Sequence, residues 1–200
     1  MDGEVTPVRG SADPVGRAGA VRRRLFVAAD VDDAARAACA RVAEQLRATG
    51  WHARWVPPEN YHLTVAFLGG VDEERVPEVI AAVRVAAARF AAFDIPLDNI
   101  GAFPSARKPR VAWVGPAVEV SAFAALCGAV RAPLAALGFT FELHADAHVT
   151  LARGEGRAPL PAVETPRIEP QRIASLTLYE SFTERTGARY VALERFPLLR

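Results

Sequence analysis

The 200-residue sequence contains few of the residues that mark disulfide-rich, metal-rich or membrane proteins: two cysteines, four histidines and one methionine. Cys39 and Cys127 lie in alanine-rich stretches, where we interpret them as small buried side chains rather than as nucleophiles or a disulfide. No apolar run approaches the ~20 residues of a membrane span. The apolar stretch after the basic residues 22–24 is too short for a signal peptide. These absences predict a soluble cytoplasmic protein.

An excess of charge of one sign is also missing. The chain has 24 basic and 23 acidic residues and a net charge of +1, so it does not attract polyanions as a whole, and any anion recognition must be local. With 51% hydrophobic residues, a chain of this length can bury roughly 70% of its unfolded surface. Neither a metal nor a disulfide is therefore needed for stability, and we expect a monomer.

The organisation along the chain is that of a mixed α and β protein. Residues 1–21 are rich in Gly, Pro and small polar residues and predict a disordered tail, followed by one domain over 22–200. Asp32 or Asp33 and Gly50 provide the end signals of a first helix, and Pro133 should kink or split the last one. The expected strands cover 23–30, 62–69, 93–103, 110–115, 147–153, 172–182 and 188–196, and the expected helices 32–50, 73–91 and 119–138.

An internal repeat connects two of the histidines. A shift of 86 positions places His62-Leu63-Thr64-Val65 on His148-Val149-Thr150-Leu151. The same shift places RLFVAA (24–29) on RVAWVG (110–115) and brings together the two predicted helices that end at glycine. This predicts a duplicated strand–helix–strand unit, with two halves related by a pseudo-twofold axis.

Strand alternation then predicts which side chains face a shared cleft. It divides residues 62–67 into His62, Thr64 and Ala66 on one face and Leu63, Val65 and Phe67 on the other. The second copy places His148, Thr150 and Ala152 together in the same way. If the halves face each other, two imidazoles and two hydroxyls line one cleft.

Such a cleft suits phosphodiester hydrolysis. One imidazole can remove a proton from water while the other protonates the leaving oxygen, because the pKa of histidine lies near ~6.5. The threonine hydroxyls can bind the non-bridging phosphate oxygens, so the chemistry requires no metal. A single His-x-Thr is most often a polar strand edge, but two copies at matched positions among four histidines favour a site.

The residues around both motifs carry a family resemblance. The chain from Arg23 to Arg200 resembles the RNA 2′,3′-cyclic phosphodiesterases, the LigT-like branch of the two-histidine phosphoesterases. The stretches that carry the resemblance are WVPPENYHLTVAFLGGVDEERV (55–76), GAFPSARKPRVAWVG (101–115), HVTLAR (148–153) and LYES (178–181).

The resemblance implies a bilobal α+β fold, in which two antiparallel sheets face a central cleft and helices pack outside. It implies hydrolysis of a 2′,3′-cyclic phosphate at RNA 3′ ends or on nucleotides to a 2′-phosphomonoester, without cofactor or metal. Some members also form 2′–5′ RNA linkages in the reverse direction. The implied roles are His62 as general acid, His148 as general base, Thr64, Thr150 and Arg153 as phosphate-binding residues, and Phe67 as a base-stacking residue.

Two features depart from this pattern. Strict alternation places Phe67 and Arg153 on the faces opposite to their histidines, so their roles depend on strand twist or on the strand ending there. The alternative interpretations are a core phenylalanine and a surface arginine. Asp146-Ala147 stands where the family usually has a proline before the second histidine. The carboxylate could orient His148 and raise its pKa, or repel the substrate phosphate.

Other interpretations remain open. His144, Asp146 and His148 form an H-x-D-x-H pattern that could bind a transition metal, although three successive positions on one strand face seldom converge on one ion. His144 is otherwise a residue of the cleft rim, and His52 a surface residue or a packing residue beside Trp51. Arginines 22–24 and the basic residues 107, 108 and 110 could bind further RNA phosphates or could simply be solvated.

The competing functions differ in class. One is a module that binds RNA ends or nucleotides without turnover. Another is a phosphodiesterase that acts on a different small cyclic phosphate or on 2′–5′ oligonucleotides. Turnover of a cyclic nucleotide separates the enzyme from the binding module.

Overall fold

A computed structural model of the chain describes residues 21–142, 146–165, 169–185 and 187–200. The predicted disordered tail therefore lies outside the described residues, apart from Val21. The helices and strands are β1 (Arg22–Asp30), α1 (Asp33–Ala48), β2 (Ala53–Trp55), η1 (Pro58–Asn60), β3 (His62–Asp72), η2 (Glu73–Arg75), α2 (Val76–Ala87), β4 (Phe93–Ile95), β5 (Asn99–Phe103), β6 (Val111–Gly115), α3 (Ser121–Ala136), β7 (Val149–Gly154), β8 (Gln171–Ile173), β9 (Ser175–Glu184) and β10 (Gly187–Pro197).

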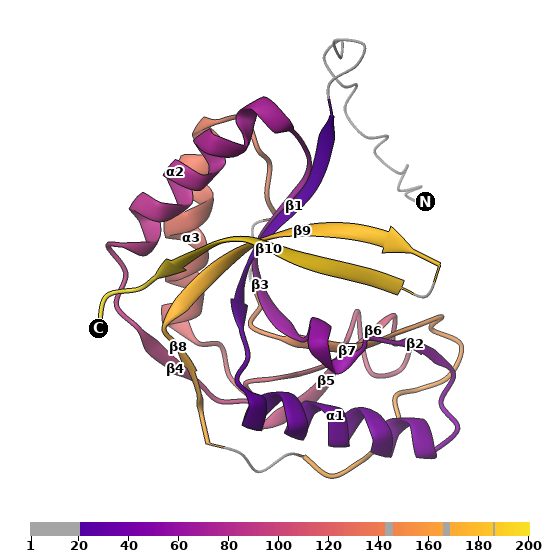
Figure 1. Ribbon diagram of the computed structural model, residues 1–200. Helices are drawn as coiled ribbons and strands as arrows, with labels where there is room; N and C mark the ends of the chain where they lie inside the picture. Colours follow the sequence, from indigo (N-terminus) through magenta and orange to yellow (C-terminus); the bar gives the residue numbers. More distant parts are fainter. Residues whose placement is uncertain (1–20, 143–145, 166–168, 186) are drawn as a thin grey trace, which may run out of the picture.

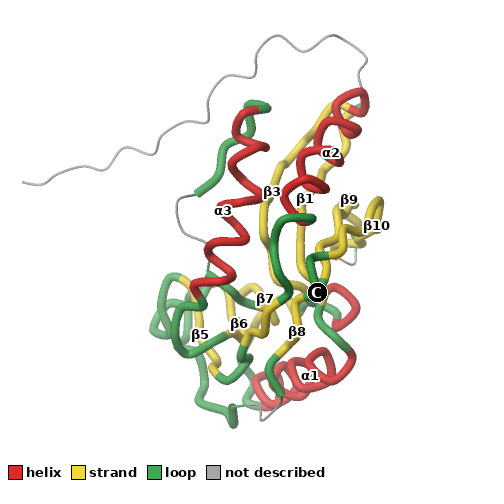
Figure 2. Tube along the Cα trace, turned by 90° about the vertical axis from the view of Figure 1, so that its left-hand side faces the viewer, coloured by secondary structure: helices red, strands yellow, loops and turns green. Residues whose placement is uncertain are grey.

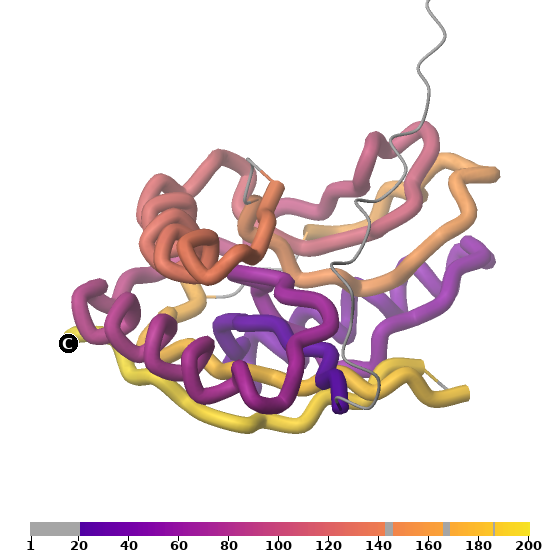
Figure 3. The backbone as a smooth tube through the Cα atoms, turned by 90° about the horizontal axis from the view of Figure 1, so that it is seen from above, coloured from indigo at the N-terminus to yellow at the C-terminus, as the bar shows by residue number. Residues whose placement is uncertain are grey.

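Within the described residues the strands form two antiparallel sheets, which confirms the predicted α+β class. The larger sheet has the order β10-β9-β1-β3-β7-β6-β5, with β2 also paired to β7, and the smaller one pairs β4 with β8. Between β3 and β7 the only matched positions are Leu63 and Val149. The larger sheet thus consists of two four-stranded halves joined at one residue pair, and Figure 3 shows β9 and β10 on one side and β5 to β7 on the other.

Two of the helices, α1 and α3, pack against the opposite half of the larger sheet, whereas α2 packs against β9 and β10 of its own half. α1, which follows β1, packs against β7, whereas α3, which follows β6, packs against β3 and α2. Figures 1 and 2 show α2 and α3 together, with α1 apart from them at the other end of the molecule. A twofold axis between the halves requires such a reciprocal exchange. The pseudo-twofold relation itself stays a prediction, which this packing supports.

The helix boundaries follow the local signals. Asp32 caps α1 by accepting a hydrogen bond from Ala35 N at 2.8 Å, and Gly50 follows the helix in the left-handed region with φ of 79°. α2 begins later than predicted, because residues 73–75 form the 3₁₀ turn η2 and Pro77 occupies the first helical turn. α3 continues through Pro133 and is not split.

Three segments differ from the prediction. The stretch 93–103 divides into β4 and β5, and the stretch 172–182 divides into β8 and β9; in each case the two strands belong to different sheets. The short strand β2 was not predicted, because three residues before two prolines give no period that could be recognised. Cys39 and Cys127 are buried free cysteines of α1 and α3, as predicted. No helix in the described part of the chain is long and apolar enough to cross a membrane.

Candidate active site

A cavity of about 600 Å³ lies between the two halves of the larger sheet. Its walls include all six side chains to which the sequence assigned a role: His62, Thr64, Phe67, His148, Thr150 and Arg153. The structure therefore brings both His-x-Thr motifs to one cleft. Their individual roles remain predictions.

The two imidazoles are held in the same way. Nδ1 of His62 lies 2.7 Å from the carbonyl oxygen of Asn60, and Nδ1 of His148 lies 2.8 Å from that of Asp146. Because a carbonyl oxygen only accepts hydrogen bonds, Nδ1 carries the proton in each ring. In the neutral ring Nε2 is then the free base, and for His62 it lies 3.0 Å from Thr64 Oγ1. Each histidine can thus accept or donate a proton through Nε2.

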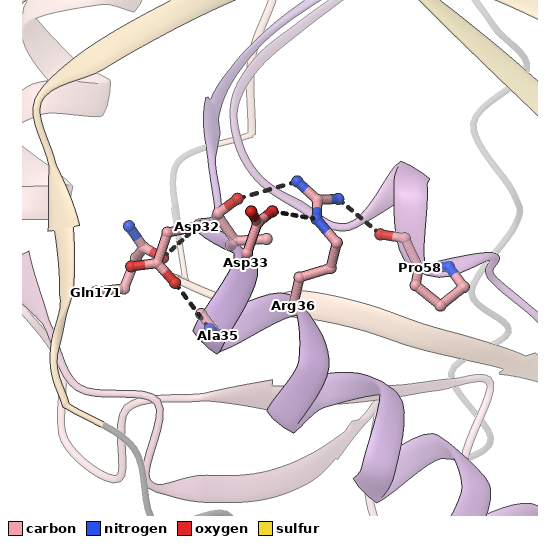
Figure 4. Close-up of polar contacts among 7 residues, drawn as sticks. Asp32, Asp33, Ala35, Arg36, Pro58 and Gln171 are labelled. Atoms are coloured by element: carbon pink, nitrogen blue, oxygen red, sulfur yellow. Dashed lines mark hydrogen bonds and ion pairs between the residues drawn. The ribbon is translucent and has the colours of Figure 1, made fainter.

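Contacts around α1 fix the turn that precedes His62. Arg36 donates to the carbonyl oxygens of Pro58, at 2.8 Å, and Val31, at 3.0 Å. At the same helix start, Gln171 Oε1 accepts from Asp32 N at 2.8 Å, as Figure 4 shows.

The buried Asn60 closes the turn before His62 by donating from Nδ2 to Ala188 O of β10 at 2.6 Å. The carbonyl that orients His62 is therefore anchored from both sides.

A register shift in β3 corrects the prediction made from strict alternation. Ala28 pairs with Thr64 and Val27 with Ala66, so Val65 is an extra residue opposite β1. Val65 and Ala66 are both fully buried, and Phe67, with 48% of its surface exposed, turns to the cleft. The prediction that Ala66 faces the cleft is wrong because a β-bulge reverses the alternation at this point.

β7 contains the same irregularity at the equivalent position. Trp113 pairs with Thr150 and Ala112 with Ala152, so Leu151 has no opposite residue on β6. Leu151 and Ala152 are buried, and Arg153 is brought to the cleft. The predicted cleft position of Ala152 is therefore also wrong. In both motifs the bulge lies three residues after the histidine and brings the fifth residue to the histidine's side.

The carbonyl groups released by the two bulges have other partners. Val65 O accepts from Arg131 Nε of α3 at 2.8 Å. Leu151 O accepts from the backbone N–H of Val56 at 2.9 Å. Neither carbonyl is left unpaired, so both bulges belong to the stable fold.

Aromatic side chains enclose both imidazoles. The rings of Phe26 and Tyr190 lie 4.9 Å and 5.4 Å from His62, and that of Phe103 lies 5.0 Å from His148. Burial lowers the pKa of His62 to about 4, and the charges of His148 and Arg153 act in the same direction. Burial is also the main cause that lowers the pKa of His148. Both rings are therefore neutral in the free protein at neutral pH.

An acidic group missed by the sequence interpretation lies beside His62. Asp30 pairs with His62 in the β1–β3 register, and its negative charge raises the pKa of the imidazole, against the larger effect of burial. Thr177 Oγ1 donates to its carboxylate at 2.9 Å, and the Tyr179 hydroxyl donates to the other oxygen. The LYES stretch contains Tyr179, but only the strand order shows what it contacts.

Asp146 affects His148 through both its backbone and its side chain. The backbone carbonyl orients the ring, and the negative charge of the carboxylate raises the pKa of His148. Burial outweighs this effect, so the pKa is lowered overall. Asp146 is exposed and is not among the residues that line the cleft.

The basic residues of the sequence divide into two groups. Arg23 forms an ion pair with Glu180 at 2.5 Å, and Arg22 forms one with Asp72 at 3.5 Å. Arg24 lines the cleft, with its guanidinium 4.9 Å from the centre of the Phe67 ring. Residues 107, 108 and 110 are not among the lining residues, whereas Arg54 of the unpredicted β2 is.

The described residues contain no group of three or more His, Cys, Asp or Glu side chains arranged to bind a metal ion. His144, the first residue of the H-x-D-x-H pattern, lies outside the described residues. His52 is exposed, which favours the surface alternative over packing beside Trp51.

Known proteins resemble this chain in sequence and in fold. The family model described as LigT like Phosphoesterase matches residues 29–113. An RNA 2′,3′-cyclic phosphodiesterase of Archaeoglobus fulgidus is 35% identical over 68% of this chain and 75% of its own length. One of Aeropyrum pernix is 34% identical over 77% of this chain and 91% of its own length.

A solved structure with a similar fold belongs to a protein of the same kind as these sequence relatives. The crystal structure of E. coli LigT in the apo form has a TM-score of 0.74 and 28% identity, and the match covers 90% of this chain and 99% of that one. E. coli LigT has also been crystallised with phosphate and with 3′-AMP. By the extent of these sequence matches, the chain belongs to the LigT-like phosphoesterase family.

Proposed function

We propose that the protein hydrolyses 2′,3′-cyclic phosphates at RNA 3′ ends to 2′-phosphomonoesters, with His62 and His148 as an acid and base pair. The observation that carries the proposal is the matched anchoring of both rings. Each binds a carbonyl oxygen through Nδ1, and both line the same cleft. The names of the relatives, RNA 2′,3′-cyclic phosphodiesterase, support the same substrate class.

The reaction needs one proton removed and one supplied. His148 Nε2 takes a proton from water, and the water oxygen attacks phosphorus opposite the 3′ oxygen. The bond between phosphorus and O3′ breaks, and O3′ receives the proton from Nε2 of protonated His62. The product carries the phosphate on O2′ and a free 3′-hydroxyl, and proton exchange with solvent restores both rings.

Thr64 couples the protonation state of the His62 imidazole to phosphate binding. While His62 is neutral, its Nε2 accepts from the Thr64 hydroxyl, 3.0 Å away. Once His62 is protonated, Nε2 becomes a donor, and the Thr64 hydroxyl is free to donate to a phosphate oxygen. Thr150 and Arg153 supply further donors, and Phe67 offers one ring face to a base, since Arg24 lies over the ring.

Identification of the product tests the proposal. RNA that ends in a 2′,3′-cyclic phosphate is incubated with chelator-treated protein, and the position of the remaining phosphate is determined. We expect a 2′-phosphate at a rate that chelation does not change, because the two imidazoles supply both proton transfers. A 3′-phosphate product would overturn the assignment of acid and base.

Substitution of the histidines tests the mechanism. His62→Ala and His148→Ala should each reduce kcat by about 10²–10⁴-fold, the usual contribution of a positioned acid or base. His52→Ala removes an exposed histidine and is the matched control, which should keep the parent activity. If the parent protein binds the RNA end but releases no product, the binding module is the correct function.

A further inference from the structure

Positive charge is concentrated in the cleft, although the chain has a net charge of only +1. The lining residues include Arg24, Arg54, Arg153 and Arg185, and Glu184 is the one acidic side chain among them. Glu184 is already paired with Arg189, at 2.6 Å. Such an excess of cations in a concave site attracts more than a single negative charge.

Two of these arginines are direct neighbours across a strand pair. Arg54 of β2 stands opposite Arg153 of β7, and both line the cleft. Side chains at such positions lie about 5 Å apart at Cβ, and like charges there repel each other. Among the described residues neither guanidinium makes an ion pair or a hydrogen bond. A bound anion between them would relieve this repulsion.

The pair lies where a substrate would extend from the histidines. His148 precedes the first residue of β7, and Arg153 is the last residue but one of the strand. The charge of Arg153 lowers the pKa of both His62 and His148, so its guanidinium is near the reacting phosphate. Arg54 continues the same positively charged wall onto β2.

The strand that carries Arg54 is firmly held. Val56 N donates to Leu151 O at 2.9 Å, directly after β2. The ring of Trp51, which precedes β2, lies 5.9 Å from that of Trp55, the last residue of the strand, in an edge-to-face contact. Gly154 makes room for Trp51, because a Cβ atom there would lie 2.8 Å from Trp51 Cζ2. Arg54 is therefore presented from a rigid position, as a ligand-binding side chain requires.

We propose that Arg54, beside Arg153, binds a second phosphate group, the one on the 5′ side of the ribose whose cyclic phosphate is hydrolysed. The proposal rests on the proposed function and deepens it. The 5′ carbon and the 2′,3′ edge lie at opposite ends of the ribose, so the two phosphates occupy separate positions along the cleft. The preferred substrate is then an RNA end or a 5′-phosphorylated nucleotide rather than a cyclic nucleoside phosphate alone.

Three substrates test the proposal: adenosine 2′,3′-cyclic phosphate, the same compound with a 5′-phosphate, and the dinucleotide ApA with a 2′,3′-cyclic end. Both compounds with a 5′-linked phosphate should have a kcat/KM about tenfold higher than the first, the value of one hydrogen bond to a charged group. Arg54→Gln should remove most of this ratio. Arg89→Gln, which removes an exposed arginine outside the cleft lining, is the control and should keep it.

Two results would overturn the subsite. One is an equal kcat/KM for all three substrates, and the other is a ratio that Arg54→Gln leaves intact. A gain limited to the dinucleotide would assign the preference to the second nucleoside instead of the phosphate, and would equally reject the proposal.

A binding measurement separates this inference from the proposed function. If none of the three substrates is hydrolysed, the proposed function fails, but the subsite can still be measured with adenosine 2′-phosphate and adenosine 2′,5′-bisphosphate. Calorimetric titration should give a Kd about tenfold lower for the bisphosphate. This difference should be lost in Arg54→Gln and retained in Arg89→Gln. Equal Kd values in the parent protein would reject the subsite.

Discussion

His62 and His148 are both neutral in the free protein, and this sets the order of events at the site. A general base must be neutral, but a general acid must carry a proton before it can donate one. Burial opposes that proton on His62, whereas Asp30 favours it. A bound phosphate adds negative charge beside the ring and raises the pKa of the imidazole further. In the proposed mechanism, substrate binding therefore promotes the protonation of His62 that a general acid requires.

This predicts different pH profiles for kcat/KM and kcat. The profile of kcat/KM reports the free protein, in which the pKa values of both histidines are lowered, that of His62 to about 4. We expect a bell whose two limbs lie below 6.5, the ordinary value of histidine. The kcat profile reports the complex and should shift to higher pH, because the phosphate favours the protonated rings.

Initial rates between pH 4 and 8 at constant ionic strength measure both profiles. Identical profiles for the two constants would contradict the coupling between phosphate binding and protonation. A kcat/KM profile without an alkaline limb would show that no protonated histidine takes part in the reaction.

The β-bulges explain how each short motif contributes a third side chain to the cleft, beside its histidine and threonine. In a regular strand, residues two apart share a face, so a histidine and the residue five positions later face opposite ways. The extra residues Val65 and Leu151 reverse this relation in both halves. Phe67 and Arg153 thereby join the histidines at the cleft.

Removal of the partner of the first bulge tests its contribution. Arg131→Met takes away the donor to Val65 O and leaves a buried carbonyl unpaired. We expect a loss of about 1–3 kcal/mol in the free energy of unfolding, the cost of leaving a buried acceptor without its hydrogen-bond partner. kcat/KM should fall several-fold, because Thr64 and Phe67 flank the bulge.

Urea unfolding and steady-state kinetics measure these two effects. Arg89→Met is the control, since Arg89 is exposed and lies outside the cleft lining. Unchanged stability and kinetics in Arg131→Met would show that the bulge does not depend on this hydrogen bond.

The features that could be predicted from the sequence are those determined by residues close to one another in the chain. The helix that starts at Asp32 and the strand at His62 follow from capping and from the strand pattern, and both are present. The bulges could not be predicted, because they are defined by the opposite strand. Arg54 and Asp30 reach the site through pairing with residues about 100 and 32 positions away, which the strand order determines and local patterns do not.

The fold also explains why the site lies between the two halves. The halves of the larger sheet meet at Leu63 and Val149. Each of these residues directly follows one of the two histidines. α1 and α3 each cover a strand of the opposite half. The histidines are therefore fixed by contacts that depend on both halves together, and their burial is a property of the complete fold.

That burial predicts how stability depends on pH. The pKa of His62 is about 4 in the folded chain and near 6.5 in the unfolded chain. Between these values the unfolded state binds more protons, so the stability from neutral His62 is complete above pH 6.5 and is lost as the pH falls toward 4. The loss for this residue is at most about 3 kcal/mol, and His148 contributes in the same direction.

Urea unfolding at several values between pH 5 and 7, where most carboxylates remain ionised, isolates this contribution. The free energy of unfolding should fall with acidification in the parent protein. The fall should be smaller in His62→Gln and smaller still when His148→Gln is added. His52→Gln, at an exposed position, is the control and should follow the parent. If the double variant shows the same acid dependence as the parent, the two imidazoles are not buried as neutral groups, and the proposed activation of His62 by the substrate loses its basis.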